Sequence, residues 1–165
     1  MTIVGEPKID QRAKTPYMGI RTRTPMKGMS KVVTQLSKDL AAWMKQQQQK
    51  PAGPPFLRFH VIDMAGDMDI EFGVPVAAAL PDDGRVKASV LPAGRYASLV
   101  YIGHGLTGNK ALIEWARANG LAWDRWDDPN GDAFRSRYEA YLTDPAIEPR
   151  KTKWEVEVAI KLKDD

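Results

Sequence analysis

Several residue types are missing from this 165-residue chain, and each absence excludes a class of protein. There is no cysteine, so the chain can form neither a disulfide framework nor a thiolate metal site or cysteine nucleophile. A chain without cysteine is typical of a reducing compartment, and we expect a cytoplasmic protein. The two histidines, His60 and His104, are too few for a histidine-rich metal site, and the sequence predicts no cofactor.

Long hydrophobic segments are also missing. No apolar run approaches the roughly 20 residues that an α-helix needs to span a bilayer. Residues 1–10 (MTIVGEPKID) lack a basic stretch followed by an apolar one, so they do not resemble a secretion signal. The sequence therefore predicts no membrane partner.

The chain has no strong excess of one charge. The formal net charge is +3, although residues 1–60 hold 11 lysines and arginines against 3 acids and residues 61–165 hold 13 against 18. The basic residues are spread through strand-like and helix-like patterns and do not form a cluster. We therefore expect no nucleic-acid partner. The pattern specifies no oligomeric state.

The hydrophobic content, 43%, is enough for one folded domain, which we expect to cover residues 1–165. Apolar residues recur at helical spacing between residues 30 and 49. This predicts an amphipathic helix with Ser30 as its N-cap and the QQQQ run as its polar last turn. A second helical pattern covers residues 107–119 and ends at Gly120.

Strand-like segments flank both predicted helices. They cover residues 8–24, 56–62 and 68–78 in the first half, and residues 85–104, 134–143 and 153–163 in the second. The PDDG stretch at residues 81–84 predicts a linker between the halves. The order strand, helix, strand, strand thus occurs twice, in repeats of about residues 8–80 and 85–163.

An offset of 79 residues aligns most of the two repeats. The aligned pairs include Tyr17 with Tyr96, Leu36 with Trp115 and Arg58 with Arg137. The same offset places Glu139 opposite His60 and Tyr141 opposite Ile62. If the repeats are related by a two-fold axis, these four residues would lie on equivalent strands.

Two such units bury their apolar surface most simply by joining their sheets and laying both helices on one face. The sequence therefore predicts an α+β fold of duplicated β-α-β-β units, with eight strands in an antiparallel sheet, two helices on one face and pseudo-two-fold symmetry. A groove between the helices, floored by the sheet, would then suit a small ligand.

One predicted strand, at residues 134–143, carries a carboxylate in its middle. Successive side chains of a strand point to opposite faces, so Arg137, Glu139 and Tyr141 share one face. On a solvent-facing sheet Glu139 is an ordinary surface residue, whereas on a covered face its desolvation is costly. A carboxylate on the floor of an aromatic groove would attract organic cations.

Three segments resemble a known family. They are LPAGRYASLVYIGHGLTGNKALIEWARANGLAW (residues 91–123), IEFGVPV (residues 70–76) and RYEAYLTDP (residues 137–145). Together they are similar to the GyrI-like small-molecule-binding domain, which is also the effector-binding domain of AraC-type and MerR-type multidrug regulators. The resemblance covers about residues 8–163 and implies the duplicated β-α-β-β fold known as the SHS2 duplication. Because no helix-turn-helix precedes residue 8, we expect a stand-alone member of the family.

The resemblance also implies a ligand class and a site. In the family, a glutamate in the penultimate strand lies at the pocket floor and faces lipophilic cations, and the matching residue is Glu139. This implies a binding protein for hydrophobic, often cationic small molecules, to which aromatic side chains would add about 0.5 to 2 kcal/mol each. The expected ligand-binding residues are Glu139, Tyr141, His60, Phe72, Tyr101, Trp123 and Met18.

Less specific roles fit some of the same residues. His60 would suit a half-buried strand position with one hydrogen bond, Met18 the hydrophobic core, and Trp123 the closure of that core. Glu71 and Glu155 align at an offset of 84 residues, and we interpret them as symmetric surface charges.

An enzymatic function is the alternative. Some stand-alone relatives are reported to open the cyclopropane ring of alkylating natural products with water. For such a hydrolase the resemblance implies Glu139 as the general base and Tyr141 as the acid. No serine-histidine-acid spacing or glycine-rich phosphate loop supports another enzyme class. Inhibition of a protein partner, as by the gyrase inhibitor that gives the family its name, is a further function that the resemblance implies.

Overall fold

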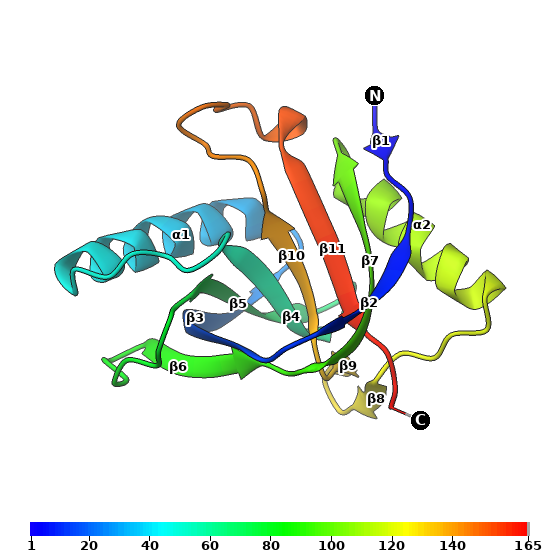
Figure 1. Cartoon of the computed structure of the whole chain (residues 1–165), viewed down its shortest axis with the longest axis horizontal. Helices are drawn as coiled ribbons and strands as arrows, with labels where there is room; N and C mark the ends of the chain where they lie inside the picture. Colours follow the sequence, from blue (N-terminus) through cyan, green and yellow to red (C-terminus); the bar gives the residue numbers. More distant parts are fainter. Residues whose placement is uncertain (165) are drawn as a thin grey trace.

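The computed structural model describes residues 1–164 (Figure 1). These residues form eleven strands, two α-helices and one short 3-10 helix, η1 (Lys151–Lys153). The helices are α1 (Met29–Gln46) and α2 (Gly105–Ala118). The strands are β1 (Ile3–Val4), β2 (Lys8–Arg12), β3 (Thr15–Pro25), β4 (Phe56–Ile62), β5 (Asp67–Pro75), β6 (Val86–Leu91), β7 (Gly94–Ile102), β8 (Arg125–Asp128), β9 (Gly131–Phe134), β10 (Arg137–Tyr141) and β11 (Glu155–Lys161). Within residues 1–164, neither helix has the length and hydrophobicity that a bilayer crossing requires.

All of these strands belong to one antiparallel sheet. Its main path runs β1-β7-β11-β10-β4-β5-β3-β6; β2 pairs with β7, and the β8–β9 hairpin attaches to β4 through β9. The order β3-α1-β4-β5 recurs as β7-α2-β10-β11, and β4 and β10 pair where the two units meet. The predicted α+β fold, with two helices and a large antiparallel sheet, is therefore confirmed.

Both helices cover the same face of the sheet. Helix α1 packs on β3 and β5 in one hydrophobic cluster, and α2 packs on β7 and β11 in another. Ile62 and Tyr141 contact both clusters, so they lie between the helices on the covered face. Figure 1 shows α1 and α2 on either side of β10 and β11.

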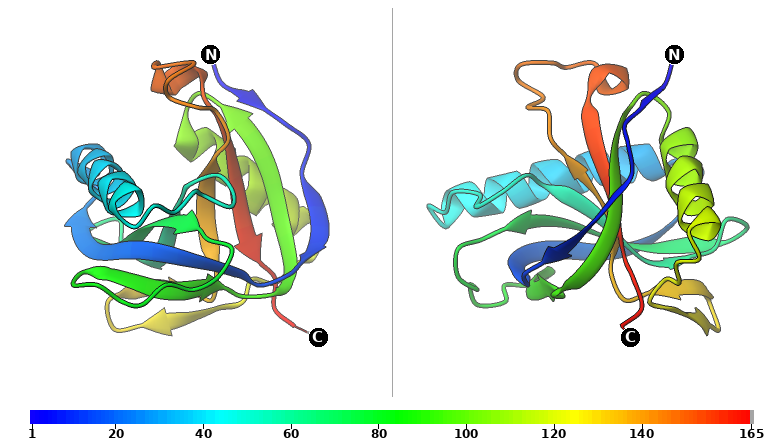
Figure 2. Two further views of the ribbon diagram at one scale, coloured as in Figure 1. Left: turned by 60° about the vertical axis from the view of Figure 1, so that its left-hand side comes forward. Right: turned by 45° about the vertical axis from the view of Figure 1, so that its right-hand side comes forward.

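The opposite face holds a second core, because the sheet curls around it. Its members are mainly aromatic or small: Tyr17, Phe56, Leu91, Tyr96, Tyr138, Ala140 and Ala159. The two views of Figure 2 show the N-terminal chain, in blue, following β7 and then crossing to β3 on the other side of the sheet. The helix side and this back face are therefore two separate environments.

Pairing between β4 and β10 corrects the predicted register of the repeats. Glu139 lies opposite Leu57, not opposite His60. A β-bulge between Phe59 and Val61 changes the alternation of β4. His60 consequently faces the back of the sheet, where it bonds Glu71.

Several predicted element boundaries were also wrong. The predicted strand at residues 8–24 is two strands, because β2 pairs with β7 whereas β3 pairs with β5 and β6. The predicted strand at residues 85–104 is likewise divided, into β6 and β7. Helix α1 begins at Met29 after Gly28, whose φ of 84° is accessible to glycine, so Ser30 is not its N-cap.

The β8–β9 hairpin was not predicted. Its four residue pairs run from Arg125 with Phe134 to Asp128 with Gly131. Gly131 has a φ of 141° in the turn. The Asp-Pro-Asn-Gly stretch at residues 128–131 is a recognisable turn signal, and β8 is too exposed to show hydrophobic alternation.

Candidate ligand-binding site

Glu139 lies in the middle of β10, on the sheet face that the helices cover. The Tyr101 hydroxyl on β7 donates to Glu139 Oε2 over 2.8 Å, and Asn109 Nδ2 on α2 donates to the same oxygen over 3.1 Å. Glu139 is half-buried, and among the described residues no donor is bonded to its other oxygen, Oε1. One carboxylate oxygen is thus held by the protein, and the other is available to a ligand.

A close approach between α2 and β7 positions the two donors. A Cβ at Gly108 would lie 2.4 Å from the Tyr101 ring, so only glycine allows the helix to rest on that ring. Asn109 follows directly, and its Nδ2 also donates to the Gly105 carbonyl over 2.9 Å. The amide is therefore fixed from both sides before any ligand arrives.

Arg137 lies beside Glu139 on the same face of β10. Its Nη2 donates to Asn109 Oδ1 over 3.0 Å, so the Asn109 amide bridges the guanidinium and the carboxylate. The guanidinium carbon lies 4.7 Å from the centroid of the Phe134 ring. Arg137 Nε is buried and has no hydrogen-bond partner among residues 1–164. The site thus holds one charge of each sign.

Burial dominates the protonation equilibria of this site. It raises the pKa of Glu139, although the hydrogen bonds from Tyr101 and Asn109 and the charge of Arg137 oppose that rise. Burial and the nearby Glu139 carboxylate raise the pKa of both Tyr101 and Tyr141. Burial also lowers the pKa of Arg137. Both tyrosines therefore remain protonated near neutral pH, and Glu139 is the acid whose charge a ligand can alter.

Aromatic rings line one side of Glu139. Tyr141, two residues further along β10, stacks on Phe72 with ring centroids 6.3 Å apart and planes inclined by 14°. Trp154 meets Tyr141 edge-on at a centroid distance of 6.1 Å. The hydroxyl of Tyr141 has no hydrogen-bond partner within the part of the chain that is described. A half-buried aromatic surface therefore adjoins the carboxylate.

Four of the predicted site residues come together here, and three do not. Glu139, Tyr141, Tyr101 and Phe72 form one contact group. His60 lies on the back of the sheet, and Met18 is 0% exposed in the core under α1. Trp123 packs in the cluster under α2 and forms a β-bridge with Leu162.

Three residues of this site were not predicted as ligand contacts. Arg137 was recognisable, because strand alternation places it on the face of Glu139. Asn109 lies one helical turn after Gly105, but only the contact between α2 and β7 brings it to Glu139. Trp154 precedes the last strand, and no local pattern reveals that it meets Tyr141.

Glu71 corrects another prediction, because it is a buried residue and not a surface charge. It is 4% exposed on the back face. The Tyr17 hydroxyl donates to Glu71 Oε1 over 2.5 Å, and His60 Nε2 lies 2.8 Å from the same oxygen. Arg58 Nη1 in turn donates to the Tyr17 hydroxyl over 2.9 Å. Glu155, its predicted equivalent, is exposed.

The fold and the family comparison identify the class of protein. A model of the GyrI-like small molecule binding domain matches residues 5–163, which is nearly the whole chain. The chain therefore belongs to the GyrI-like family of small-molecule-binding domains. None of the curated proteins compared with the chain matches it.

Solved structures of similar fold include regulator domains and a hydrolase. The EcmrR C-terminal domain has a TM-score of 0.72 at 16% identity, over 99% of this chain and 100% of that one. A hydrolase from Listeria innocua has a TM-score of 0.62 at 15% identity, over 96% and 92% of the two chains. SAV2435 bound to tetraphenylphosphonium has a TM-score of 0.59 at 11% identity, over 96% and 94%. This chain spans 58% of the EcmrR chain in its complex with DNA.

Proposed function

We propose that this protein binds hydrophobic, cationic small molecules at Glu139, on the face between α1 and α2. The observation that carries the proposal is a half-buried carboxylate with one oxygen free and an aromatic surface beside it. A flat organic cation would place its charge against Oε1 and its rings against Tyr141 and Trp154. Binding of tetraphenylphosphonium by SAV2435, a protein of similar fold, supports the ligand class.

The charges of the site favour such a ligand. A desolvated carboxylate prefers its neutral form, and an incoming cation restores the ionised form by Coulomb attraction in a poorly solvated setting. Arg137 does not saturate Glu139, because its printed hydrogen bond goes to the Asn109 carbonyl oxygen and its plane lies against Phe134. Glu139 therefore keeps an unshared oxygen for the ligand.

A titration with two probes of similar shape tests the proposal. Tetraphenylphosphonium carries a positive charge, whereas triphenylphosphine oxide is neutral. In Glu139→Gln the side chain keeps its size but loses its charge, so binding of the cation should fall by about tenfold or more, equivalent to ~1.4 kcal/mol. Binding of the neutral probe should change little.

Glu155→Gln is the matched control, because it removes an exposed glutamate from the strand beside β10. This variant should bind both probes as the wild type does. Equal affinity of the wild type and Glu139→Gln for tetraphenylphosphonium would refute Glu139 as the cation-binding residue.

Hydrolysis of strained, cyclopropane-bearing electrophiles is the second candidate function. The observation that favours it is the free Glu139 Oε1 near the unbonded hydroxyl of Tyr141. Glu139 would take a proton from water as its oxygen attacks a ring carbon. The ring carbon–carbon bond would break, and Tyr141 would protonate the departing carbon.

Turnover separates this candidate from simple binding. A hydrolase should release the ring-opened hydroxyl product, detected by mass spectrometry, and lose that product in Glu139→Gln while still binding the substrate. Tyr141→Phe should also lower the rate without abolishing binding. Wild-type protein that binds the electrophile and returns it unchanged would leave binding as the function.

A further inference from the structure

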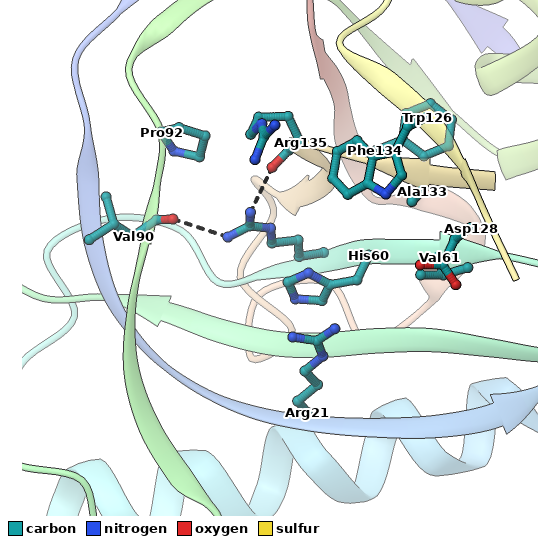
Figure 3. Close-up of a pocket in the computed structure, with 11 residues that line it drawn as sticks. Arg21, His60, Val61, Val90, Pro92, Trp126, Asp128, Ala133, Phe134 and Arg135 are labelled. Carbon is teal, nitrogen blue, oxygen red and sulfur yellow. Dashed lines mark hydrogen bonds between the residues drawn. The ribbon is translucent and has the colours of Figure 1, made fainter. Parts of the chain in front are cut away.

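The back face of the sheet contains a cavity that is separate from the Glu139 site. Its volume is about 400 Å³, within the range of small-molecule pockets. It lies between the strands β3 and β4 and the β8–β9 hairpin (Figure 3). The lining residues are Arg21, Arg58, His60, Val61, Val90, Pro92, Trp126, Asp128, Ala133, Phe134 and Arg135.

Arg58 is a buried cation whose hydrogen bonds go to neutral groups. It is 8% exposed. Its Nη1 donates to the Val90 carbonyl over 3.0 Å as well as to Tyr17, and its Nη2 donates to the Arg135 carbonyl over 2.8 Å. Arg58 Nε is buried without a partner, and no carboxylate in the described chain forms an ion pair with this guanidinium. A buried charge without a direct counter-ion is costly, and an anion bound in the cavity would offset that cost.

Two further arginines surround the cavity, and their partners leave them accessible. Arg21 forms two hydrogen bonds with Asp69, each 2.8 Å, but its side chain is 53% exposed whereas that of Asp69 is 15% exposed. Arg135 is a long 3.7 Å from Asp124. Figure 3 shows the Arg21 guanidinium directed toward the ring of His60. The polar groups accessible from the cavity are therefore mostly cationic.

The acidic groups of this region are either occupied or on the periphery. Glu71 lies behind His60 and accepts hydrogen bonds from Tyr17 as well. Asp69 is bound by Arg21. Asp128 is the one acidic residue that lines the cavity, and it belongs to the hairpin end near Val61 (Figure 3). The end of the cavity that holds Arg58 and Arg135 has no acidic lining residue.

An aromatic wall completes the cavity. Trp126 is 42% exposed, and the guanidinium carbon of Arg135 lies 4.9 Å from the centroid of its ring. Phe134 and Val61 add apolar surface beside it. An exposed tryptophan next to arginine side chains offers both stacking and charge to a flat ligand.

We propose that this back-face cavity binds a small aromatic anion, such as an aromatic carboxylate. The ring would lie against Trp126, and the carboxylate would face Arg21, Arg58 and Arg135. Arginine suits this role because its planar fork of N–H donors matches carboxylate geometry. This ligand has the opposite charge to the one proposed for Glu139, and its site lies on the opposite face of the sheet.

Three naphthalene probes of matched shape test the charge preference. They are 1-naphthoate, which is anionic, 1-naphthamide, which is neutral, and 1-naphthylmethylammonium, which is cationic. Titration should give at least tenfold tighter binding of 1-naphthoate than of the other two. In NMR spectra, 1-naphthoate should shift the indole N–H signal of Trp126. Similar affinity for all three probes, or no shift at Trp126, would overturn the proposal.

Variants of exposed arginines then test the site without disturbing the core. Arg135→Gln removes one cation, and Arg21→Gln combined with Asp69→Asn removes the ion pair without leaving a free carboxylate. Each should weaken 1-naphthoate binding severalfold, and together they should weaken it at least tenfold. Arg23→Gln is the matched control, an exposed arginine on the same strand outside the cavity. Loss of binding in Arg23→Gln as large as in the cavity variants would show only a general charge effect and would overturn the proposal.

The experiment is independent of the function proposed for Glu139. Glu139→Gln should bind 1-naphthoate as the wild type does, and tetraphenylphosphonium should not displace the anion. Displacement by the cation would place both probes in one site and would contradict a second one. Thermal unfolding of every variant confirms that it is folded.

Discussion

Glu71 and Glu139 are two glutamates of one sheet whose pKa values move in opposite directions. Burial raises the pKa of both. At Glu71, hydrogen bonds from His60 and Tyr17 together outweigh burial, so the pKa falls below its usual value. At Glu139, the donors Tyr101 and Asn109 do not outweigh it, so the pKa rises. Glu71 is thus held ionised as a structural residue, whereas Glu139 remains an acid that a ligand can influence.

Glu71→Gln should lower the free energy of unfolding at pH 7 by about 2 to 4 kcal/mol, because Arg58 and its network lose their buried negative charge. A lowered pKa stabilises the fold above the pKa of the unfolded chain, near 4.5, and this contribution disappears as the pH falls through the folded value. The difference between wild type and variant should therefore shrink toward pH 3 in urea unfolding. A difference that stays constant with pH would contradict an ionised Glu71.

Glu139 should show the opposite dependence. Because its folded pKa is raised, its contribution to stability is present below the unfolded pKa and is lost as the pH rises through the folded value. Glu139→Gln should therefore be as stable as the wild type at pH 7, or more so. Binding of tetraphenylphosphonium should weaken about tenfold per pH unit once the pH falls below the raised pKa, while the variant shows no such change. Parallel pH profiles of binding for the two proteins would contradict this assignment.

At the scale of elements, the contact between α2 and β7 is what assembles the Glu139 site. Gly108 touches the ring of Tyr101, and the next residue, Asn109, reaches Glu139. Helix α1 has no equivalent polar residue bonded to Leu57, the β4 residue opposite Glu139. The two helices therefore play different parts: α2 holds the carboxylate, and α1 closes a purely hydrophobic cluster on the other side.

Gly108→Ala tests this contact. Alanine favours helices over glycine by about 1 kcal/mol, so the substitution would stabilise an unhindered helix. Here the new methyl group would collide with the buried Tyr101 ring, and overpacking should lower stability by about 1 to 3 kcal/mol. Cation binding should also weaken, because α2 would carry Asn109 away from Glu139.

Thr107→Ala is the control for Gly108→Ala, since Thr107 is an exposed neighbour in the same helix. It should leave both stability and binding unchanged or slightly improved. If Gly108→Ala raises the melting temperature, the close packing of α2 on β7 does not hold.

How well the elements could be predicted depended on whether local patterns determine them. Strand alternation correctly grouped Arg137, Glu139 and Tyr141, because β10 is regular and one of its faces is covered. The bulge in β4 defeated the same rule at His60. Contacts between distant elements, such as Asn109 with Glu139, have no local signature at all. The aromatic neighbour Trp154 was missed for that reason as well.

At the scale of the whole molecule, the sheet separates two polar regions of different character. The helix side carries Glu139 and aromatic rings, and the back face carries Arg58 with its network. The overall α+β architecture could be predicted because the order of elements repeats and both helices are amphipathic. The back-face cavity could not, because it requires the unpredicted β8–β9 hairpin to cover β4.

The distribution of charge over the whole molecule predicts no specific binding to duplex DNA. Many arginines are already paired with acids, which leaves no continuous basic surface for phosphates. These ion pairs join Arg12 to Glu157, Arg21 to Asp69, Arg85 to Asp39, Arg125 to Asp132 and Arg150 to Glu148.

A residual, nonspecific attraction from the net charge of +3 should weaken steeply as counter-ions compete for the phosphates. We therefore expect the protein to elute from immobilised duplex DNA below roughly 0.2 M salt, with no preference among sequences. Arg23→Gln, Arg117→Gln and Arg135→Gln, which remove exposed charges from three elements, should each lower the elution salt slightly and by similar amounts. Retention at higher salt, or a large effect of one of these variants, would reveal a localised phosphate-binding surface and contradict the prediction.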